Sequence, residues 1–228
     1  MGKNNLLYTS LSVFTFLLSF NLQAKKSEAK IDQDINKAQT IMGKYSVAGG
    51  VEVGLNMTTE KKVLGTKTNN KGKIIYQSGR FNLTVEGDKK SEMVYDGKKA
   101  YLISYPDIEL DPKGKRKIIV LKETDRSQVG ILLNLMENPK KYFSEFKITK
   151  LENKNDILKL KLEDKNKKIK KPITLTFALK GGYLKSLNYL DDVDSVISVD
   201  LESPVFPKSI SKNVFKYNAL KNDEVIRQ

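Results

Sequence analysis

The sequence contains no cysteine, no histidine and no tryptophan among its 228 residues. Without histidine or cysteine the chain cannot build a Ser-His-Asp triad, a thiol nucleophile, or an imidazole or thiolate metal site. Any catalysis would have to use carboxylate, lysine or tyrosine side chains, and the sequence carries no spacing typical of such a site. We therefore expect a protein that is not an enzyme, with no cofactor, no metal site and no disulfide.

One group of acidic residues offers an alternative to this expectation. Asp191, Asp192 and Asp194 stand close together and could bind a cation or act as a carboxylate pair. They also fall where a turn between two strands is predicted, and aspartate is favoured there because its side chain bonds to nearby backbone N–H groups. We favour the turn role.

The charge balance is strongly basic, with 41 Lys and Arg against 27 Asp and Glu. Most lysines are scattered along the chain, which is typical of solvated faces and turns. Two stretches are denser, KGKRK at Lys113–Lys117 and KNKKIKK at Lys165–Lys171. Each is either a docking patch for an anionic partner or the soluble tip of a hairpin.

The amino terminus has the pattern of a secretory signal peptide. Lys3 precedes an apolar stretch from Leu6 to Leu22, and Leu22-Gln23-Ala24 provides a cleavage site before the polar residues that follow. We expect residues 1–24 to be removed and residues 25–228 to form one exported domain, the alternative being an uncleaved anchor. An exported basic protein meets anionic lipids, glycans or acidic proteins, and we expect no nucleic-acid partner.

Hydrophobic periodicity predicts one amino-terminal helix followed by many strands. Apolar residues recur at spacings of three and four from Ile31 to Met42, and after Gly50 the period changes to two. Turn signals such as Asp96-Gly97 separate the strands, so neighbours are expected to pair antiparallel. The alternating segments include residues 51–57, 81–85, 101–105, 157–162, 173–179, 184–189, 197–201 and 214–217.

A second helical region interrupts the strands. The apolar residues from Val129 to Met136 are too dense for strand alternation and indicate a short helix that ends at Asn138-Pro139. A weaker helical turn is predicted from Pro139 to Phe143. The fold class is thus α+β, with one antiparallel sheet of ten or eleven strands. A sheet this wide must curl into a barrel or half-barrel. The amino-terminal helix and the central helix either fill its concave face or leave a ligand cavity there.

A recognisable order of features occupies the block KGKIIYQSGRFNLTVEGDKKSEMVYDGKKAYLISYPDIEL, from Lys71 to Leu110. A glycine opens one strand, a basic residue and a phenylalanine open the next, and an Asp-Gly-Lys turn leads to an aromatic strand and a proline. The residues that carry this pattern are Gly72, Arg80, Phe81, Asp96, Gly97, Lys98, Tyr101 and Pro106. In this block the chain resembles the LolA family, the periplasmic carriers of outer-membrane lipoproteins. The order of the segments after the block, a central helix followed by further strands, resembles the same family.

The resemblance implies an incomplete barrel whose apolar cavity, under a central lid helix, takes up the acyl chains of lipoproteins. The expected strand residues of the cavity are Ile74, Tyr76, Phe81, Leu83, Val85, Met93, Tyr95, Tyr101 and Ile103, and those of the lid are Leu132, Leu135 and Met136. At each of these positions, tight core packing is the alternative to ligand contact.

The chain departs from the family pattern in the first hairpin. The family has an arginine and a proline before the aromatic residue, and that arginine takes part in opening and closing the lid. Here Ser78 and Gly79 occupy those positions, and Arg80 follows two residues after the family arginine. Because strand side chains alternate with a period of two, Arg80 could still point to the same face and act as the lid switch.

The resemblance also implies partners and a location. We expect a monomeric periplasmic carrier that receives acylated lipoproteins from an inner-membrane lipoprotein-releasing transporter and passes them to a receptor at the outer membrane. The alternative is a periplasmic sensor or interaction module of the same fold that binds lipids or lipoproteins without transporting them.

Overall fold

The computed structural model describes most of residues 30–227. The predicted signal peptide lies outside the described residues. Those described are 30–46, 49–87, 89–107, 109–121, 130–166, 169, 171–191 and 193–227. Residues 39–228 form one compact unit, and residues 30–38 belong to another. Residues 30–43 are helical, in agreement with the predicted amino-terminal helix. No helix among the described residues is long and apolar enough to cross a bilayer.

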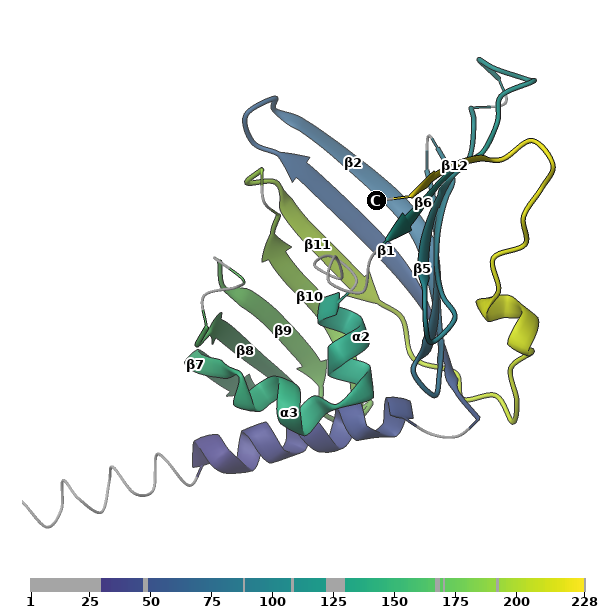
Figure 1. The fold of residues 1–228 in the computed structure, drawn as a ribbon. Helices are drawn as coiled ribbons and strands as arrows, with labels where there is room; N and C mark the ends of the chain where they lie inside the picture. The colour runs from purple at the N-terminus through teal and green to yellow at the C-terminus, as the bar shows by residue number, and fades with distance from the viewer. Residues whose placement is uncertain are drawn as a thin grey trace, which may run out of the picture. The chain divides into compact units, whose positions relative to one another are not determined.

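Within the described residues, twelve strands form one sheet, one or two more than the sequence predicts. Their order is β12-β6-β5-β4-β3-β2-β1-β11-β10-β9-β8-β7, and the sheet curls without closing on itself (Figure 1). All neighbours are antiparallel except β12, which lies parallel to β6. The strands are β1 (Val51–Lys61), β2 (Thr66–Gln77), β3 (Arg80–Glu86), β4 (Ser91–Tyr95), β5 (Ala100–Ser104), β6 (Lys117–Leu121), β7 (Phe146–Lys154), β8 (Ile157–Asp164), β9 (Ile173–Ala178), β10 (Tyr183–Leu190), β11 (Val196–Leu201) and β12 (Glu224–Arg227).

The two predicted central helices are confirmed. They are α2 (Gly130–Glu137) and α3 (Pro139–Ser144), and both lie on the inner side of the curled sheet (Figure 1). Val129, where the prediction begins, lies outside the described residues. The side chain of Asn138 caps α3 by accepting a hydrogen bond from the Lys141 backbone, and Pro139 occupies the first turn, where its missing N–H costs nothing.

Strict alternation explains the packing of β8 and β9. On β8, Leu158, Leu160 and Leu162 are fully buried, while the lysines between them are exposed. The inner residues of β9 follow the same pattern, whereas in β10 a register shift between Leu184 and Ser186 leaves the adjacent Ser186 and Leu187 both buried. Burying a leucine side chain contributes about 1.5–3 kcal/mol, so this half of the inner face is a conventional core.

The buried tyrosine of the 3-10 helix η1 (Lys44–Ser46) ties the start of the compact unit to β10. The Tyr45 hydroxyl accepts a hydrogen bond from the backbone N–H of Leu184, and its ring lies edge-on to Phe206. Burial raises the pKa of Tyr45 to about 12, so the hydroxyl keeps its proton throughout the physiological range.

The strand predicted at residues 214–217 is wrong. Residues Lys212–Phe215 form a short 3-10 helix, η2, which Ser211 caps, and the last strand is β12, nearer the carboxyl end. The period-two spacing of Phe215 and Tyr217 arises because this segment packs across the outer face of the sheet. There it covers an apolar cluster of Val94, Ile103 and Ile118, and Tyr217 stacks on Tyr101 with 4.9 Å between ring centroids.

A partly buried ion pair holds this carboxyl-terminal segment in place. The guanidinium of Arg116 donates two hydrogen bonds to the carboxylate of Asp223, at 2.8 and 2.7 Å, and a third to the carbonyl of Asn218. Asp223 also accepts from the Tyr217 hydroxyl and the Leu220 backbone. These donors favour the charged carboxylate and hold the pKa of Asp223 well below its usual range.

The two lysine-rich stretches differ in what the structure describes of them. The stretch KGKRK contributes one structural arginine, Arg116, among exposed lysines. In the stretch KNKKIKK, residues 167, 168 and 170 lie outside the described residues, so its role stays a prediction.

We expect Asp223→Asn to lower the free energy of unfolding by about 2 kcal/mol, because charge-assisted hydrogen bonds are lost in a partly buried site. The pKa of Asp223 is lowered on folding, so its contribution is complete above the unfolded pKa near 4 and declines as the pH falls below that value. Urea unfolding of both proteins between about pH 7 and pH 3 tests this, since the difference should shrink at the acid end.

Glu152→Gln is the matched control, because Glu152 pairs with Lys150 on the exposed surface. We expect this variant to unfold like the parent chain. An Asp223→Asn variant as stable as Glu152→Gln at neutral pH would contradict the role given to the ion pair.

Candidate functional site

The strands from β1 to β6 build an apolar surface on the inner face through their register. One row of neighbours runs across the strands without interruption by a polar residue. Its members are Val53, Ile74, Leu83, Met93, Leu102 and Ile119. A second row, on the same face and two residue pairs nearer the β2–β3 turn, consists of Val51, Tyr76, Phe81, Tyr95, Ala100 and Leu121.

Burial decreases along both rows toward the edge of the sheet. Val53 and Ile74 are 1% and 0% exposed, whereas Leu83 and Met93 are only partly buried. The same change occurs in the second row after Phe81. We call the partly exposed residues of the two rows the inner apolar surface: Leu83, Met93, Leu102, Ile119, Tyr95, Ala100 and Leu121. Apolar side chains that a fold leaves partly uncovered on a concave face are typical of a binding site for an apolar ligand.

The helix α2 presents apolar side chains in almost every direction. Leu132, Leu135 and Met136, the residues predicted on the lid, are 7%, 0% and 0% exposed. The carbonyl of Met136 accepts a hydrogen bond from the Ser46 hydroxyl, which attaches the end of α2 to η1. In this conformation the three lid residues are part of the core.

Seven of the nine predicted strand residues lie on the inner face. Four are buried, namely Ile74, Tyr76, Phe81 and Val85, while Leu83, Met93 and Tyr95 are only partly buried and belong to the inner apolar surface. Burial also raises the pKa of Tyr76, whose hydroxyl accepts a hydrogen bond from the Gly79 backbone.

The placement of Tyr101 and Ile103 on the inner face is wrong. Tyr95 pairs with Ala100 across the turn, so the inner residue that follows is Leu102, and the residues on either side of it face outward. Tyr101 and Ile103 pack under the carboxyl-terminal segment. The missed inner residues are Leu102, Ile119 and Leu121, which a count of residue pairs outward from the Asp96-Gly97 turn would have found.

The acidic group at residues 191–194 has the predicted turn role in the part that the structure describes. Asp191 accepts hydrogen bonds from the backbone N–H groups of Val193 and Ser195, at 3.0 and 2.8 Å, and Asp194 pairs with Lys171. Asp192 lies outside the described residues. Within the described residues no group of three or more acidic side chains is arranged to hold a metal ion.

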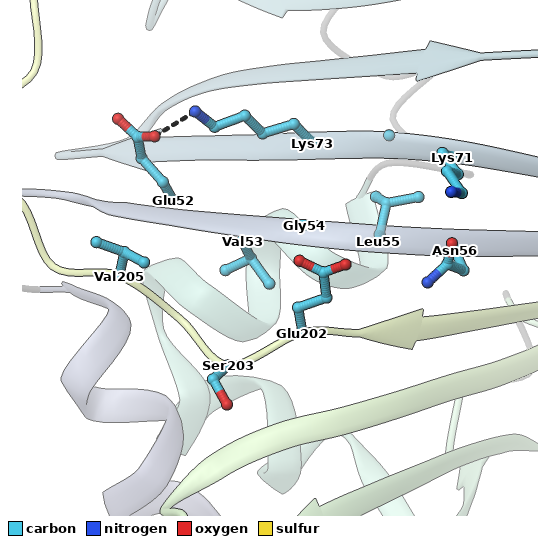
Figure 2. A pocket seen from close by; sticks show the side chains of 11 residues that line it. Glu52, Val53, Gly54, Leu55, Asn56, Lys71, Lys73, Glu202, Ser203 and Val205 are labelled. Carbon is cyan, nitrogen blue, oxygen red and sulfur yellow. Dashed lines mark ion pairs between the residues drawn. The ribbon is translucent and has the colours of Figure 1, made fainter.

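A pocket of about 430 Å³ opens on the outer face, between β1, β2 and the segment after β11 (Figure 2). Glu52 forms an ion pair with Lys73 at one side, and Glu202 lies against Gly54, where a side chain would meet its carboxylate. Charged walls of both signs do not suit an acyl chain. The inner apolar surface is therefore the better candidate site.

The family model for outer membrane lipoprotein carrier protein LolA matches residues 58–218, which is 161 of the 228 residues. The chain belongs to the LolA family. This is a family of periplasmic proteins that bind and carry lipoproteins, not of enzymes. The search of curated proteins gave no match.

The solved structures that match this LolA family member have little sequence identity to it, and their TM-scores lie below 0.5. A LolA superfamily protein from Nitrosomonas europaea is 9% identical, with 82% of this chain and 97% of that chain covered and a TM-score of 0.42. A conserved uncharacterized protein from Thermus thermophilus is 7% identical, with coverages of 87% and 99% and a TM-score of 0.46. A candidate outer membrane lipoprotein-sorting domain from Vibrio parahaemolyticus is 10% identical, with coverages of 81% and 96% and a TM-score of 0.43.

The departure from the LolA pattern has a conformational reason. Ser78 and Gly79 both have positive φ, 49° and 75°, as in the two-residue turns that join tight hairpins. Proline cannot adopt this conformation because its ring fixes φ near −65°. The expectation that Arg80 points to the lid is wrong here. Its guanidinium lies 5.2 Å from the Phe215 ring centroid, on the outer side, and donates to Gln77.

We expect Ser46→Ala to loosen the end of α2. The variant loses one hydrogen bond worth about 1 kcal/mol, so amide exchange at residues 134–137 should become roughly fivefold faster. Hydrogen exchange measured by mass spectrometry tests this, with β8 as the internal reference. Unchanged exchange in α2, or equal acceleration in β8, would contradict a specific attachment through Ser46.

Proposed function

We propose that the protein binds the acyl chains of lipoproteins or lipids on its inner apolar surface and carries them through the periplasm from the inner to the outer membrane. The observation that supports this most directly is the pair of apolar rows, which continue across six strands while their burial decreases. Membership of the LolA family supports the same function.

The chemistry of this surface suits a carrier. Burial of each methylene of an acyl chain contributes about 0.8 kcal/mol, so even partial coverage of a long chain provides useful affinity. A carrier must also release its cargo, and a shallow surface that leaves part of the chain in contact with water limits that affinity. Met93 lies at the centre of the surface, where a flexible thioether can adapt to chains of different length.

The helix α2 covers part of the inner face and so limits the area on which an acyl chain can bind. The residues of α2 are buried, so acyl chains can lie along β3 to β6 without displacing this helix, whereas deeper entry requires α2 to move away from the sheet. We expect short-chain ligands to bind without this movement and long or multiple chains to require it.

Cargo and partners follow from the proposed carrier role. The protein would receive acylated lipoproteins from a releasing transporter of the inner membrane and transfer them to an outer-membrane receptor, acting as a monomer. Cleavage of residues 1–24 on export would place it in the periplasm.

A pair of variants on neighbouring strands tests the proposed site. Leu83 lies on the inner apolar surface, and Ile75 is also a partly exposed aliphatic residue but lies on the outer face of the adjacent strand. We expect Leu83→Gln to weaken binding of a fluorescent fatty acid roughly tenfold, because removing one leucine contact costs more than about 1 kcal/mol. Ile75→Gln should bind the probe like the parent chain.

Titration of the probe into each protein, purified without detergent, provides the measurement. Thermal unfolding of both variants shows whether they remain folded at the assay temperature. Equal weakening by Leu83→Gln and Ile75→Gln, or no saturable binding by the parent chain, would contradict acyl binding at this surface. The latter result would favour an interaction module that does not bind lipid.

A further inference from the structure

The alternating strand directions place five strand connections at one end of the sheet. These are the connections β1–β2, β3–β4, β5–β6, β8–β9 and β10–β11, and the upper end of the sheet in Figure 1 carries them. We call their described residues the loop rim. The other end carries the β2–β3, β4–β5, β7–β8 and β9–β10 turns.

The loop rim exposes apolar side chains to an unusual degree. Val63, Leu110, Val193 and Leu64 are 88%, 83%, 74% and 67% exposed, and they have the highest exposure among the large hydrophobic residues that the structure describes. All four belong to connections of this rim. Exposing several such residues at one end of a sheet has a free-energy cost that a binding partner would remove.

The longest hairpin extends past β3 on one side, while on the other side β11 stays paired with β1 as far as Glu60, just before the apolar tip. The β1–β2 pairs from Met57–Asn70 to Lys61–Thr66 lie beyond the last residue pair of β2 with β3. Five residue pairs correspond to about 16 Å of strand. Val63 and Leu64 at the tip are therefore free to enter a surface that the rim approaches.

Lysines flank the exposed apolar residues. Lys61, Lys62 and Lys67 surround the β1–β2 tip, and exposed lysines also occupy the β3–β4 and β5–β6 connections at positions 89, 113 and 115. The carboxylates of the rim are partly occupied by their own turns, since Asp107 accepts hydrogen bonds from the backbone of Glu109 and Leu110. Lysine next to an exposed aliphatic side chain is the combination that binds anionic lipid surfaces, because the cation meets phosphates while the apolar group enters the headgroup region.

We propose that the loop rim docks on an anionic bilayer, with Val63 and Leu64 inserted among the lipid headgroups. The inference rests on the exposure and charge of the rim and does not depend on acyl binding at the inner apolar surface. Docking would orient the sheet with one end toward the membrane.

The absence of tryptophan from the chain allows a direct test. Leu64→Trp places a single reporter at the hairpin tip, and Val205→Trp places one at an exposed position, 63% accessible, near the other end of the sheet. With vesicles of phosphatidylglycerol and phosphatidylethanolamine, the emission of Leu64→Trp should shift to the blue and be quenched by brominated acyl chains. The emission of Val205→Trp should neither shift on addition of the vesicles nor be quenched by the brominated acyl chains.

Sedimentation with the same vesicles tests the energetics in the tryptophan-free chain. We expect the double variant Val63→Asp/Leu64→Asp and the double variant Lys61→Glu/Lys62→Glu each to lower the partition coefficient roughly tenfold or more. Val205→Asp should partition like the parent chain, and raising the salt concentration should weaken binding of the parent. All proteins share the same amino terminus, so its contribution cancels.

Two results would overturn the proposal. One is equal binding of the parent chain to anionic and to neutral phosphatidylcholine vesicles, and the other is unchanged partitioning of Val63→Asp/Leu64→Asp. Unchanged partitioning of Val63→Asp/Leu64→Asp would leave the lysines as the only contact, and an acidic protein surface would then be the better partner for them. Retained fatty-acid binding by the rim variants separates this inference from the proposed carrier function.

Discussion

Twelve strands in one sheet cannot lie flat, and the resulting curl creates an inner face that must be covered or used. The two short helices α2 and α3 and the packed core of β8 to β10 satisfy one half of that face. Toward β6 the same apolar rows continue with less cover. The candidate site therefore lies where the helices no longer cover the inner face. Its formation needs no residue of special chemistry.

The outer face shows the opposite arrangement in the same strands. There the carboxyl-terminal segment covers Val94, Ile103 and Ile118, and the Arg116–Asp223 pair fixes it before β12 joins the edge of β6. β6 also carries Ile119 and Leu121 of the inner apolar surface. The strand at the edge of the candidate site thus depends on an ion pair on the other side of the sheet.

Much of the fold is predictable from local pattern. Alternation identified most strands, and the dense apolar run before Asn138 identified α2. The strand β6 escaped because its four consecutive apolar residues, Ile118 to Leu121, do not alternate with polar ones. The segment around Phe215 was mistaken for a strand because spacing cannot distinguish pairing from packing across a face. Tyr101 was placed inside because the register of a hairpin depends on its turn, which exchanges the two faces when the count shifts by one residue.

The central claim is that acyl chains occupy the inner face of β3 to β6, and photo-crosslinking tests it most directly. A fatty acid with a diazirine near its methyl end would be bound to the detergent-free protein, irradiated, and its attachment sites mapped by peptide mass spectrometry. The account predicts adducts at Leu83, Met93, Leu102 or Ile119, and their loss when unlabelled fatty acid is added. Adducts confined to the outer face, or labelling that excess fatty acid does not reduce, would contradict it.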